Sequence, residues 1–362
     1  MTNFTPPAQP DGNLTTSRPR ITWLDSLKGF TIISVVIGHV VAGYMKAGSF
    51  PDTYSLQLFL FQAIGTFEMP LFFIVSGFMY AMAYFDADGR PKLNKLKWQL
   101  PNIAILYFLF TALIVAFKVF FSKYTNDQWT SWAPFFNSWH SPIAPYWYLY
   151  ALFGFYLISA PLVRMKQRVW LLPILLAVSA VIPALFSLRG FCSNEIVYYS
   201  LFFAMGIVAQ RNNITLSWPP TIIALCASVI IAVIFWGNGL GTPKDYVHYH
   251  PTVNTFVAIG ICLFLWKLFS ATPALDNRLF NLCGRYCLEI YVLHCFFTAG
   301  FRSVLPALGL HNFYLNLILN SILSTALPLL IALATQRLHI HTIIFRPAYA
   351  LKSLLAPNPV KP

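Results

Sequence analysis

Two ionisable side chains stand eleven residues apart in a stretch that is otherwise apolar enough to enter a bilayer, LDSLKGFTIISVVIGHV over residues 24–40. In an α-helix, eleven residues end about 20° past three full turns and roughly 16.5 Å further along the axis, so Lys28 and His39 would share one helix face. An imidazole in a membrane span must face a polar interior or a cavity, and its ordinary pKa suits it to general base catalysis. A simple interhelical hydrogen bond is the structural alternative for His39. One turn before Lys28, Asp25 can pair with the lysine or cap the start of the helix.

A second apolar stretch, FEMPLFFIVSGF over residues 67–78, carries Glu68, Pro70, Ser76 and Gly77. A carboxylate inside a span is costly unless it finds a partner, and an imidazole such as His39 would be a suitable one. Pro70 removes a backbone hydrogen bond and is expected to kink the helix. Ser76 and Gly77 allow another segment to approach closely, so tight helix packing is the structural explanation for both.

A third stretch, GRYCLEIYVLHCFF over residues 284–297, adds Glu289, Tyr291 and His294. Tyr291 and His294 are three residues apart and share a helix face, whereas Glu289 lies about 140° away from His294 around the helix. Two imidazoles and two carboxylates within membrane spans require a polar cavity, which we therefore predict.

The basic loop RPKLNKLKWQLP, residues 90–101, admits two explanations. A cytoplasmic location of the loop accounts for most of its charge. The sharper hypothesis is that Lys95 and Lys97 bind the phosphates of an anionic cofactor. The six cysteines show neither CxxC pairs nor metal spacing with histidine, so we interpret them as small packing residues and expect no metal.

The composition identifies the elements that must position these residues. The chain has 362 residues, of which 57% are hydrophobic and only 10% charged, as in a polytopic membrane protein. Its net charge of +13 does not indicate nucleic-acid binding, because the lysines and arginines lie in short loops between apolar segments. We predict an all-α bundle of about ten transmembrane helices, at residues 24–45, 56–85, 99–121, 144–163, 169–187, 196–210, 219–236, 252–268, 286–305 and 313–336.

The distribution of basic residues predicts the topology. With the N-terminus inside, 18 of the 24 lysines and arginines fall on the cytoplasmic side, and the other six are Lys46, Lys118, Lys123, Arg189, Lys244 and Arg302. Both termini are therefore expected to be cytoplasmic. We predict a disordered tail over residues 1–19 without a cleavable signal, a membrane domain over 20–345 and a C-terminal tail over 346–362. Two aromatic, histidine-bearing outer loops, 122–143 and 237–251, are either interfacial belts or a sugar-stacking surface.

Four segments in this order resemble the integral-membrane acyltransferase family 3: WLDSLKGFTIISVVIGH, MPLFFIVSGF, YWYLYALFGFYLISAPL and LEIYVLH. Members of this family move acyl groups, usually acetyl, onto hydroxyls of cell-surface glycans. The resemblance implies that His39 matches the family's essential histidine, that Lys28 matches the basic residue before it, and that acetyl-CoA is the cytoplasmic donor. Two departures concern the acceptor contacts. Many relatives have His where this chain has Glu68, and relatives often have Glu where this chain has Ala151 and Leu152.

We therefore expect an inner-membrane O-acyltransferase that acetylates an exopolysaccharide or lipid-linked sugar. His39 would be the base, with Glu68 tuning it, and the cations at the donor phosphates would be Lys28, Lys95 and Lys97. Residues expected to bind substrate or support the site are Asp25, Ser76, Trp147, Glu289, Tyr291 and His294. Expected partners are the glycan acceptor, membrane lipid and polysaccharide-assembly proteins, and no nucleic acid. A glycan or lipid transporter is the alternative, since ionisable residues in spans also mark substrate pathways.

Overall fold

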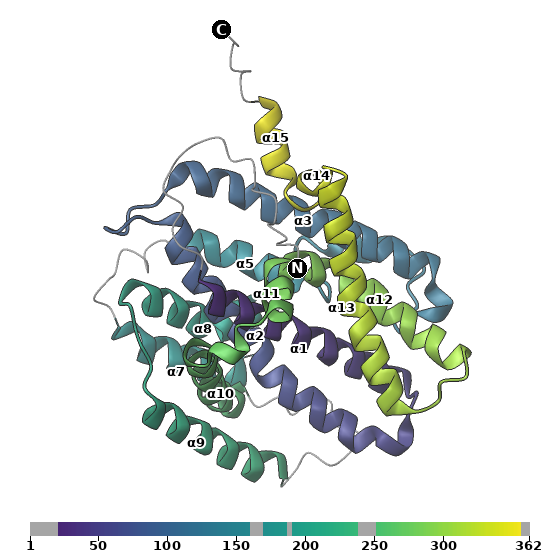
Figure 1. The fold of residues 1–362 in the computed structure, drawn as a ribbon, viewed down its shortest axis with the longest axis horizontal. Coiled ribbons are helices and arrows are strands. Elements are labelled where there is room, and N and C mark those ends of the chain that lie inside the picture. The colour runs from purple at the N-terminus through teal and green to yellow at the C-terminus, as the bar shows by residue number, and fades with distance from the viewer. Residues whose placement is uncertain (1–20, 160–168, 187–189, 238–250, 356–362) are drawn as a thin grey trace, which may run out of the picture.

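A computed structural model describes residues 21–159, 169–186, 190–237 and 251–355, and over these ranges the chain forms helices and no β-strand (Figure 1). The predicted all-α class is therefore confirmed. The described helices are α1 (Thr22–Ala47), α2 (Tyr54–Tyr84), α3 (Leu93–Phe120), α4 (Ala133–Asn137), α5 (Trp147–Ile158), α7 (Leu171–Leu185), α8 (Ser193–Arg211), α9 (Trp218–Gly237), α10 (Pro251–Ala271), α11 (Arg278–Arg285), α12 (Cys287–Ala307), α13 (Phe313–Arg337), α14 (His341–Phe345) and α15 (Pro347–Leu355).

Each of the ten predicted spans contains a described helix, but the helices differ in length. Seven helices of the described chain are long and apolar enough to cross a membrane: α1, α2, α3, α9, α10, α12 and α13. The fourth and fifth predicted spans contain shorter apolar helices, α5 with 12 residues and α7 with 15, where a crossing needs roughly 20. The sixth contains α8, which has 19 residues but carries polar residues at both ends. The count of ten spans thus stays a prediction.

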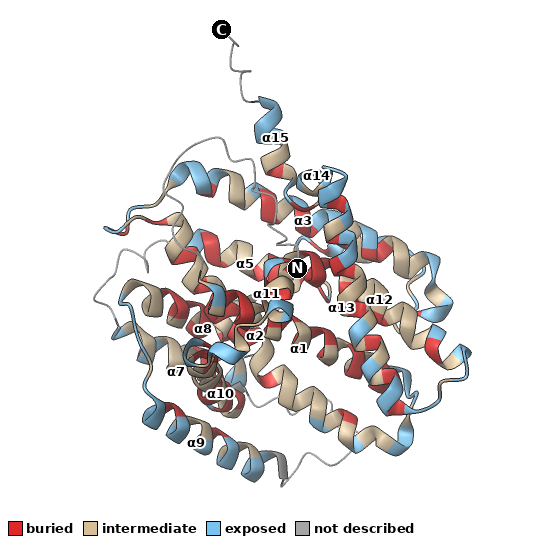
Figure 2. Cartoon of the chain, in the orientation of Figure 1, coloured by how far each residue is buried: buried red, intermediate tan, exposed pale blue. Residues whose placement is uncertain are grey.

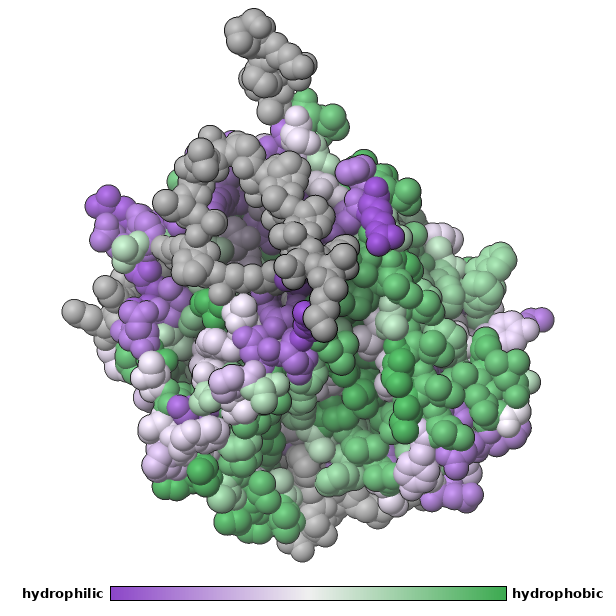
Figure 3. All heavy atoms as spheres, in the orientation of Figure 1, coloured by the Kyte–Doolittle hydropathy of each residue, from purple (hydrophilic) through white to green (hydrophobic). Residues whose placement is uncertain are grey.

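The outward faces of the long helices are apolar, as expected where lipid is the solvent. On α13 four of the exposed apolar side chains lie along one face: Leu315, Ile318, Ile322 and Leu330. Apolar residues cover the visible surface over α12 and α13 (Figure 3). The helix α9 packs beside α10 and leaves most of its length exposed (Figure 2).

Glycines bring the central helices into backbone contact. A Cβ atom on Gly77 of α2 would lie 1.9 Å from the carbonyl oxygen of Phe203 on α8, which confirms that the SGF sequence permits a close approach. A Cβ atom on Gly29 of α1 would likewise lie 1.9 Å from the carbonyl oxygen of Phe280 on α11. These contacts fix the positions of α1 and α2. Pro70 lies inside α2, which continues to Tyr84.

Buried polar side chains join α1, α12 and α13. The amide nitrogen of Asn320 donates to the Tyr44 hydroxyl at 3.2 Å and to the Thr298 carbonyl at 3.2 Å, and its oxygen accepts from Ser324 at 2.9 Å. The Tyr44 hydroxyl in turn donates to Asn316 at 3.3 Å. Because lipid offers no hydrogen bonds, such groups must be satisfied between helices, and this network holds α1 against α12.

The C-terminal helices return to α3. The backbone N–H of Ala348 donates to the Asn102 side chain at 3.3 Å, and the Tyr349 hydroxyl donates to Gln99 at 3.0 Å. Residues 347–355, which the sequence placed in the C-terminal tail, are thus helical and packed against α3. The predicted disordered residues 1–19, the end of the chain from 356 and most of the loop 237–251 lie outside the described residues.

Candidate active site

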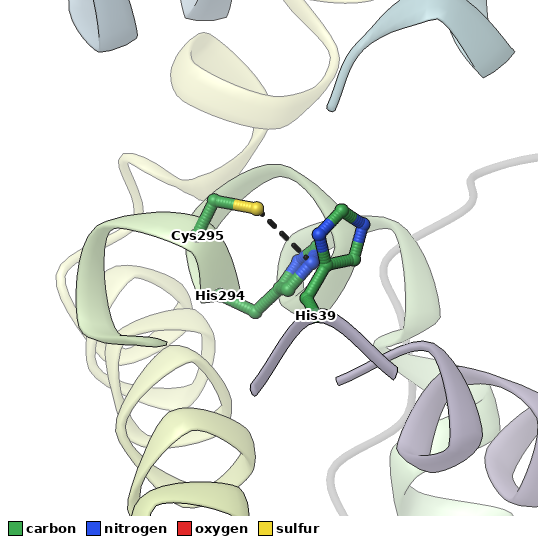
Figure 4. Close-up of side chains that lie close together, drawn as sticks. All are labelled: His39, His294 and Cys295. Carbon is green, nitrogen blue, oxygen red and sulfur yellow. Dashed lines mark hydrogen bonds between the residues drawn. The ribbon is translucent and has the colours of Figure 1, made fainter. Parts of the chain in front are cut away.

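The two imidazoles predicted from separate spans lie together. The rings of His39 on α1 and His294 on α12 have centroids 4.9 Å apart at an interplanar angle of 61° (Figure 4). His294 is fully buried, whereas His39 is partly accessible. The neighbour of His39 is therefore the second histidine and not Glu68, which the sequence suggested.

The hydrogen bonds of His294 assign its tautomer. Its Nδ1 lies 3.1 Å from the carbonyl oxygen of Ile290 and 2.7 Å from that of Tyr291, and carbonyl oxygens only accept. The proton is thus on Nδ1, and Nε2 is an acceptor. The thiol of Cys295 is 3.2 Å from Nε2 and donates to it (Figure 4). The ring of His294 is held in one orientation next to His39.

These side chains also form a set of metal-donor types. One ligand atom each from His39, His294 and Cys295 lies within 4.8 Å of the others. Imidazole nitrogens and a thiolate are ligands of zinc, which commonly takes three protein ligands in catalytic sites. This set was not predicted from the sequence, because a metal motif is recognised by closely spaced ligands and His39 lies on a helix far from the other two in the chain. The predicted absence of a metal stays a prediction.

A cavity of about 180 Å³ lies beside His39. Cys295, Thr298 and Arg302 line it from α12, Ile114 and Lys118 from α3, and residues 125–127 from the following loop. Lys46, near the end of α1, lies at the same cavity. The charged lining residues were not singled out from the sequence, although the topology prediction had already placed Lys46, Lys118 and Arg302 on the side with few basic residues.

Asp127 joins two of these cations. Its carboxylate is 2.5 Å from the Lys46 ammonium and also pairs with Lys118. Burial alone would raise the pKa of Asp127, but the hydrogen bonds and positive charges of Lys118 and Lys46 outweigh it and hold the pKa below its ordinary value. Asp127 is therefore a carboxylate at neutral pH and connects α1 with α3.

Tyrosines hold α5 against the site. The Tyr291 hydroxyl donates to the Pro145 carbonyl at 2.5 Å, and the Tyr146 hydroxyl donates to the Val292 carbonyl at 2.7 Å. Ser76 and Tyr148 share a hydrogen bond of 2.6 Å, and the Tyr148 ring packs 5.4 Å from that of Tyr291. Ser76 and Tyr291 thus support the wall and do not line the cavity beside His39.

Trp147 lines a second cavity, of about 320 Å³. His140, Asn194 and Glu195 are among its polar lining residues, and Ala144 lines both cavities. The two spaces are therefore adjacent. Trp147 also packs against Tyr199 with ring centroids 5.4 Å apart, which fixes its ring at the cavity wall.

Glu68 does not pair with His39. Its Oε2 lies 2.9 Å from the position that a Cβ atom on Gly38 would occupy. This oxygen is buried and has no hydrogen bond to any described residue. Glu68 therefore lies between α1 and α2. It faces Gly38, the residue before His39, and forms no hydrogen bond with the imidazole. The expected influence of Glu68 on the basicity of His39 is therefore not supported by a direct contact.

The remaining predicted residues lie toward the other end of α1. Of the two alternatives for Asp25, pairing with Lys28 or capping the helix, the structure contains the ion pair, at 2.6 Å. Glu289 pairs with His341 of α14 at 2.8 Å, a residue that the sequence did not single out. Lys95 and Lys97 are exposed in the first turns of α3. The predicted site residues thus separate into a histidine cavity and a distant, more polar end, and do not form one cluster.

The comparison with protein families gives a match over most of the chain. The model of acyltransferase family 3, described as an acyltransferase domain, matches residues 21–337, which include both histidines and the lining of both cavities. Neither the curated proteins nor the solved structures that were compared contain a match to this chain. The family match and the apolar helices make the protein a membrane acyltransferase. The chain belongs to acyltransferase family 3.

Proposed function

We propose that the protein transfers an acetyl group from acetyl-CoA to a hydroxyl of a cell-surface or lipid-linked glycan. The observation that carries this proposal is the His39 imidazole, which lines a cavity and has a second, oriented imidazole behind it. A general base needs access to the proton it removes, and His39 has this access because it lines the cavity.

In the proposed reaction, a nitrogen of His39 accepts the proton of the acceptor hydroxyl. The oxygen attacks the thioester carbonyl, the carbon–sulfur bond breaks, and the proton passes to the departing CoA thiolate. His294 is the positioning residue, because its Nδ1–H is anchored to two carbonyls of α12 and its ring packs on His39. No metal takes part in this scheme.

The donor is proposed to enter from the end of α1 that carries Lys28. Lys28 lies eleven residues before His39 on the same helix, a rise of about 16.5 Å. Its ammonium is already paired with Asp25, so it has two donors left for a CoA phosphate. Lys95 and Lys97, exposed on α3, are the other proposed phosphate ligands.

The acceptor is proposed to occupy the histidine cavity and to extend into the adjacent cavity at Trp147, whose aromatic ring suits a sugar face. The proposed location is the cell inner membrane, where polysaccharide-assembly proteins would supply or consume the glycan. Membership of an acyltransferase family favours this function over the transporter that the sequence left as the alternative.

Labelled acetyl-CoA tests the proposal in membranes that contain the full chain. Wild-type membranes should transfer label to surface glycan, and His39→Ala should lose at least a hundredfold of this activity, since a general base contributes about 10²–10⁴-fold. His311→Ala is the matched control, because His311 is an exposed histidine outside both cavities. A His39→Ala protein that inserts normally and still acetylates glycan would refute the assignment.

A further inference from the structure

Arg302 lies in the wall of the cavity that contains His39, and none of the ion pairs of the described residues includes it. Its one described hydrogen bond runs from Nη2 to the Tyr124 carbonyl at 3.2 Å. A guanidinium has five N–H donors in a rigid fork that matches a carboxylate or a phosphate. Most of the donors of Arg302 are therefore not used by the described protein.

The surrounding charges do not balance. Lys46, Lys118 and Arg302 line the cavity, and Asp127 is the single carboxylate among its lining residues, which leaves a surplus of two positive charges. The Lys118 side chain is only 17% exposed, so water hydrates its charge poorly. A partly buried surplus of positive charge is costly unless an anion offsets it. The excess lies within the same small space as the proposed base.

The Asp127 carboxylate already has two partners, so it is not free to serve Arg302 as well. It joins Lys46 and Lys118, and no described ion pair extends from it to Arg302. Lys118 has a further neighbour in Trp129, whose ring centroid is 4.2 Å from the ammonium. This ring and Asp127 hold Lys118 in place and leave some of its three donors for another acceptor.

We propose that this cavity binds an acidic acceptor, whose carboxylate or phosphate lies between Arg302 and Lys118 while a hydroxyl of the same sugar faces His39. This inference rests on the proposed function and adds the charge class of the substrate. The cavity of about 180 Å³ is smaller than the roughly 300–1,000 Å³ of most ligand pockets, so it suits one acidic sugar residue. Arg302 is then a substrate-binding residue that discriminates acidic from neutral acceptors.

Three small acceptors test the proposal with the full chain in nanodiscs and labelled acetyl-CoA. 4-Nitrophenyl β-glucuronide carries a carboxylate, glucose 1-phosphate carries a phosphate, and 4-nitrophenyl β-glucoside is the neutral control. Because a hydrogen bond to a charged group is worth about 1.5–3 kcal/mol, we expect kcat/KM for one of the acidic acceptors to exceed that of the glucoside by about 10- to 100-fold. Which acid is preferred separates a uronic acid from a sugar or lipid phosphate.

Arg302→Gln should raise the KM of the preferred acidic acceptor by about tenfold or more and leave that of the glucoside unchanged. Arg302→Lys should retain part of the preference, because it keeps the charge but not the fork. Lys123→Gln is the matched control, because Lys123 is an exposed cation in the loop after α3, near Arg302 in the fold, and does not line the cavity. Equal kcat/KM for acidic and neutral acceptors, unaffected by Arg302→Gln, would overturn the inference and leave the acyltransferase function intact.

Binding provides a readout that needs no turnover. Glucuronate or inorganic phosphate should raise the melting temperature of the wild-type protein and of Lys123→Gln, but not of Arg302→Gln, and glucose should have no effect. If neither anion stabilises the wild-type protein, the inference is wrong. If an anion stabilises it through Arg302 but no glycan is acetylated, the anion site stands and the proposed function fails.

Discussion

At the scale of single residues, the two neighbouring histidines have different surroundings. In the proposed reaction one imidazole moves a proton, and His39 is the accessible ring of the two. The other ring, His294, donates from Nδ1 to the carbonyls of Ile290 and Tyr291 and accepts a hydrogen bond from the Cys295 thiol at Nε2. A fully satisfied ring makes a rigid surface, and the accessible His39 ring rests against it.

Cys295 is expected to be a supporting group and not a nucleophile or a metal ligand. Its thiol only donates to His294, so Cys295→Ala should lower kcat by less than about tenfold, because it removes one weak hydrogen bond. Treatment with 1,10-phenanthroline should leave acetyl transfer unchanged. The measurement is initial rate with and without chelator, together with metal analysis of the purified protein.

The alternative roles of Cys295 predict a different activity for Cys295→Ala. A covalent acyl-thioester at this residue or a zinc ion held by His39, His294 and Cys295 would make Cys295→Ala nearly inactive. A stoichiometric zinc ion whose removal abolishes transfer would show that the three donors form a metal site. Cys226→Ala is the matched control, since that cysteine is exposed on α9.

At the scale of elements, α13 has a polar face buried toward α1 and α12 and an apolar face exposed to lipid. Asn320→Leu should destabilise the protein by about 1–2 kcal/mol, because it leaves Tyr44, Ser324 and the Thr298 carbonyl without the amide. The check is the melting temperature in one defined detergent. Ile318→Leu, on the exposed face, should leave it unchanged. Equal melting temperatures for Asn320→Leu and wild type would show that the network contributes little.

The loop after α3 gives a prediction that depends on pH. Since the pKa of Asp127 is lowered in the folded protein, its ion pairs stabilise the fold above the ordinary pKa of aspartate, and this contribution is lost as pH falls through the folded pKa. Asp127→Asn should therefore cost roughly 1 kcal/mol at pH 7, with most of it from the better-buried Lys118 pair. Below the folded pKa the variant and wild type should converge.

Thermal unfolding from pH 7 to pH 3 measures this difference. Asp52→Asn is the control, because Asp52 is exposed in the short segment Pro51–Thr53 after α1 and has no described ion pair. A destabilisation of Asp127→Asn that is the same at every pH would mean that the amide disturbs the loop for reasons other than charge.

At the scale of the whole molecule, the sequence predicted what depends on composition and on spacing within one helix. The helix positions follow from apolar runs long enough to cross a membrane. The shared face of Tyr291 and His294 and the Asp25–Lys28 pair follow from 3.6 residues per turn. The pairing of His39 with His294 did not, because it depends on how α1 packs against α12. The cavity beside His39 likewise depends on α3 and α12, which the spacing within α1 does not predict.

The residues that the sequence missed are those whose meaning depends on a neighbour. Lys118 and Arg302 look like the flanking cations of two spans, and Asp127 looks like a solvated loop acid. Only their convergence beside His39 distinguishes them from other flanking charges.

Glu68 shows the converse. As an isolated carboxylate in a span it suggested a partner in His39, whereas the fold places it against Gly38. Asn316, Asn320 and Ser324 repeat every four residues, a pattern that could have been found.

The arrangement along α1 predicts that donor and acceptor reach the site from opposite sides of the membrane. Lys28 lies near the first turn, and the histidine cavity extends to Lys46 in the last turn and to the loop at 125–127. The distribution of basic residues predicts that Lys28 lies inside and Lys46 outside.

Sealed right-side-out vesicles loaded with labelled acetyl-CoA should therefore label an impermeant glucuronide added outside. Inside-out vesicles given both substrates outside should form product only after detergent opens them, and His39→Ala vesicles should form none. Product from intact inside-out vesicles would show that the acceptor enters from the donor side, and the assigned direction of the cavity would be wrong.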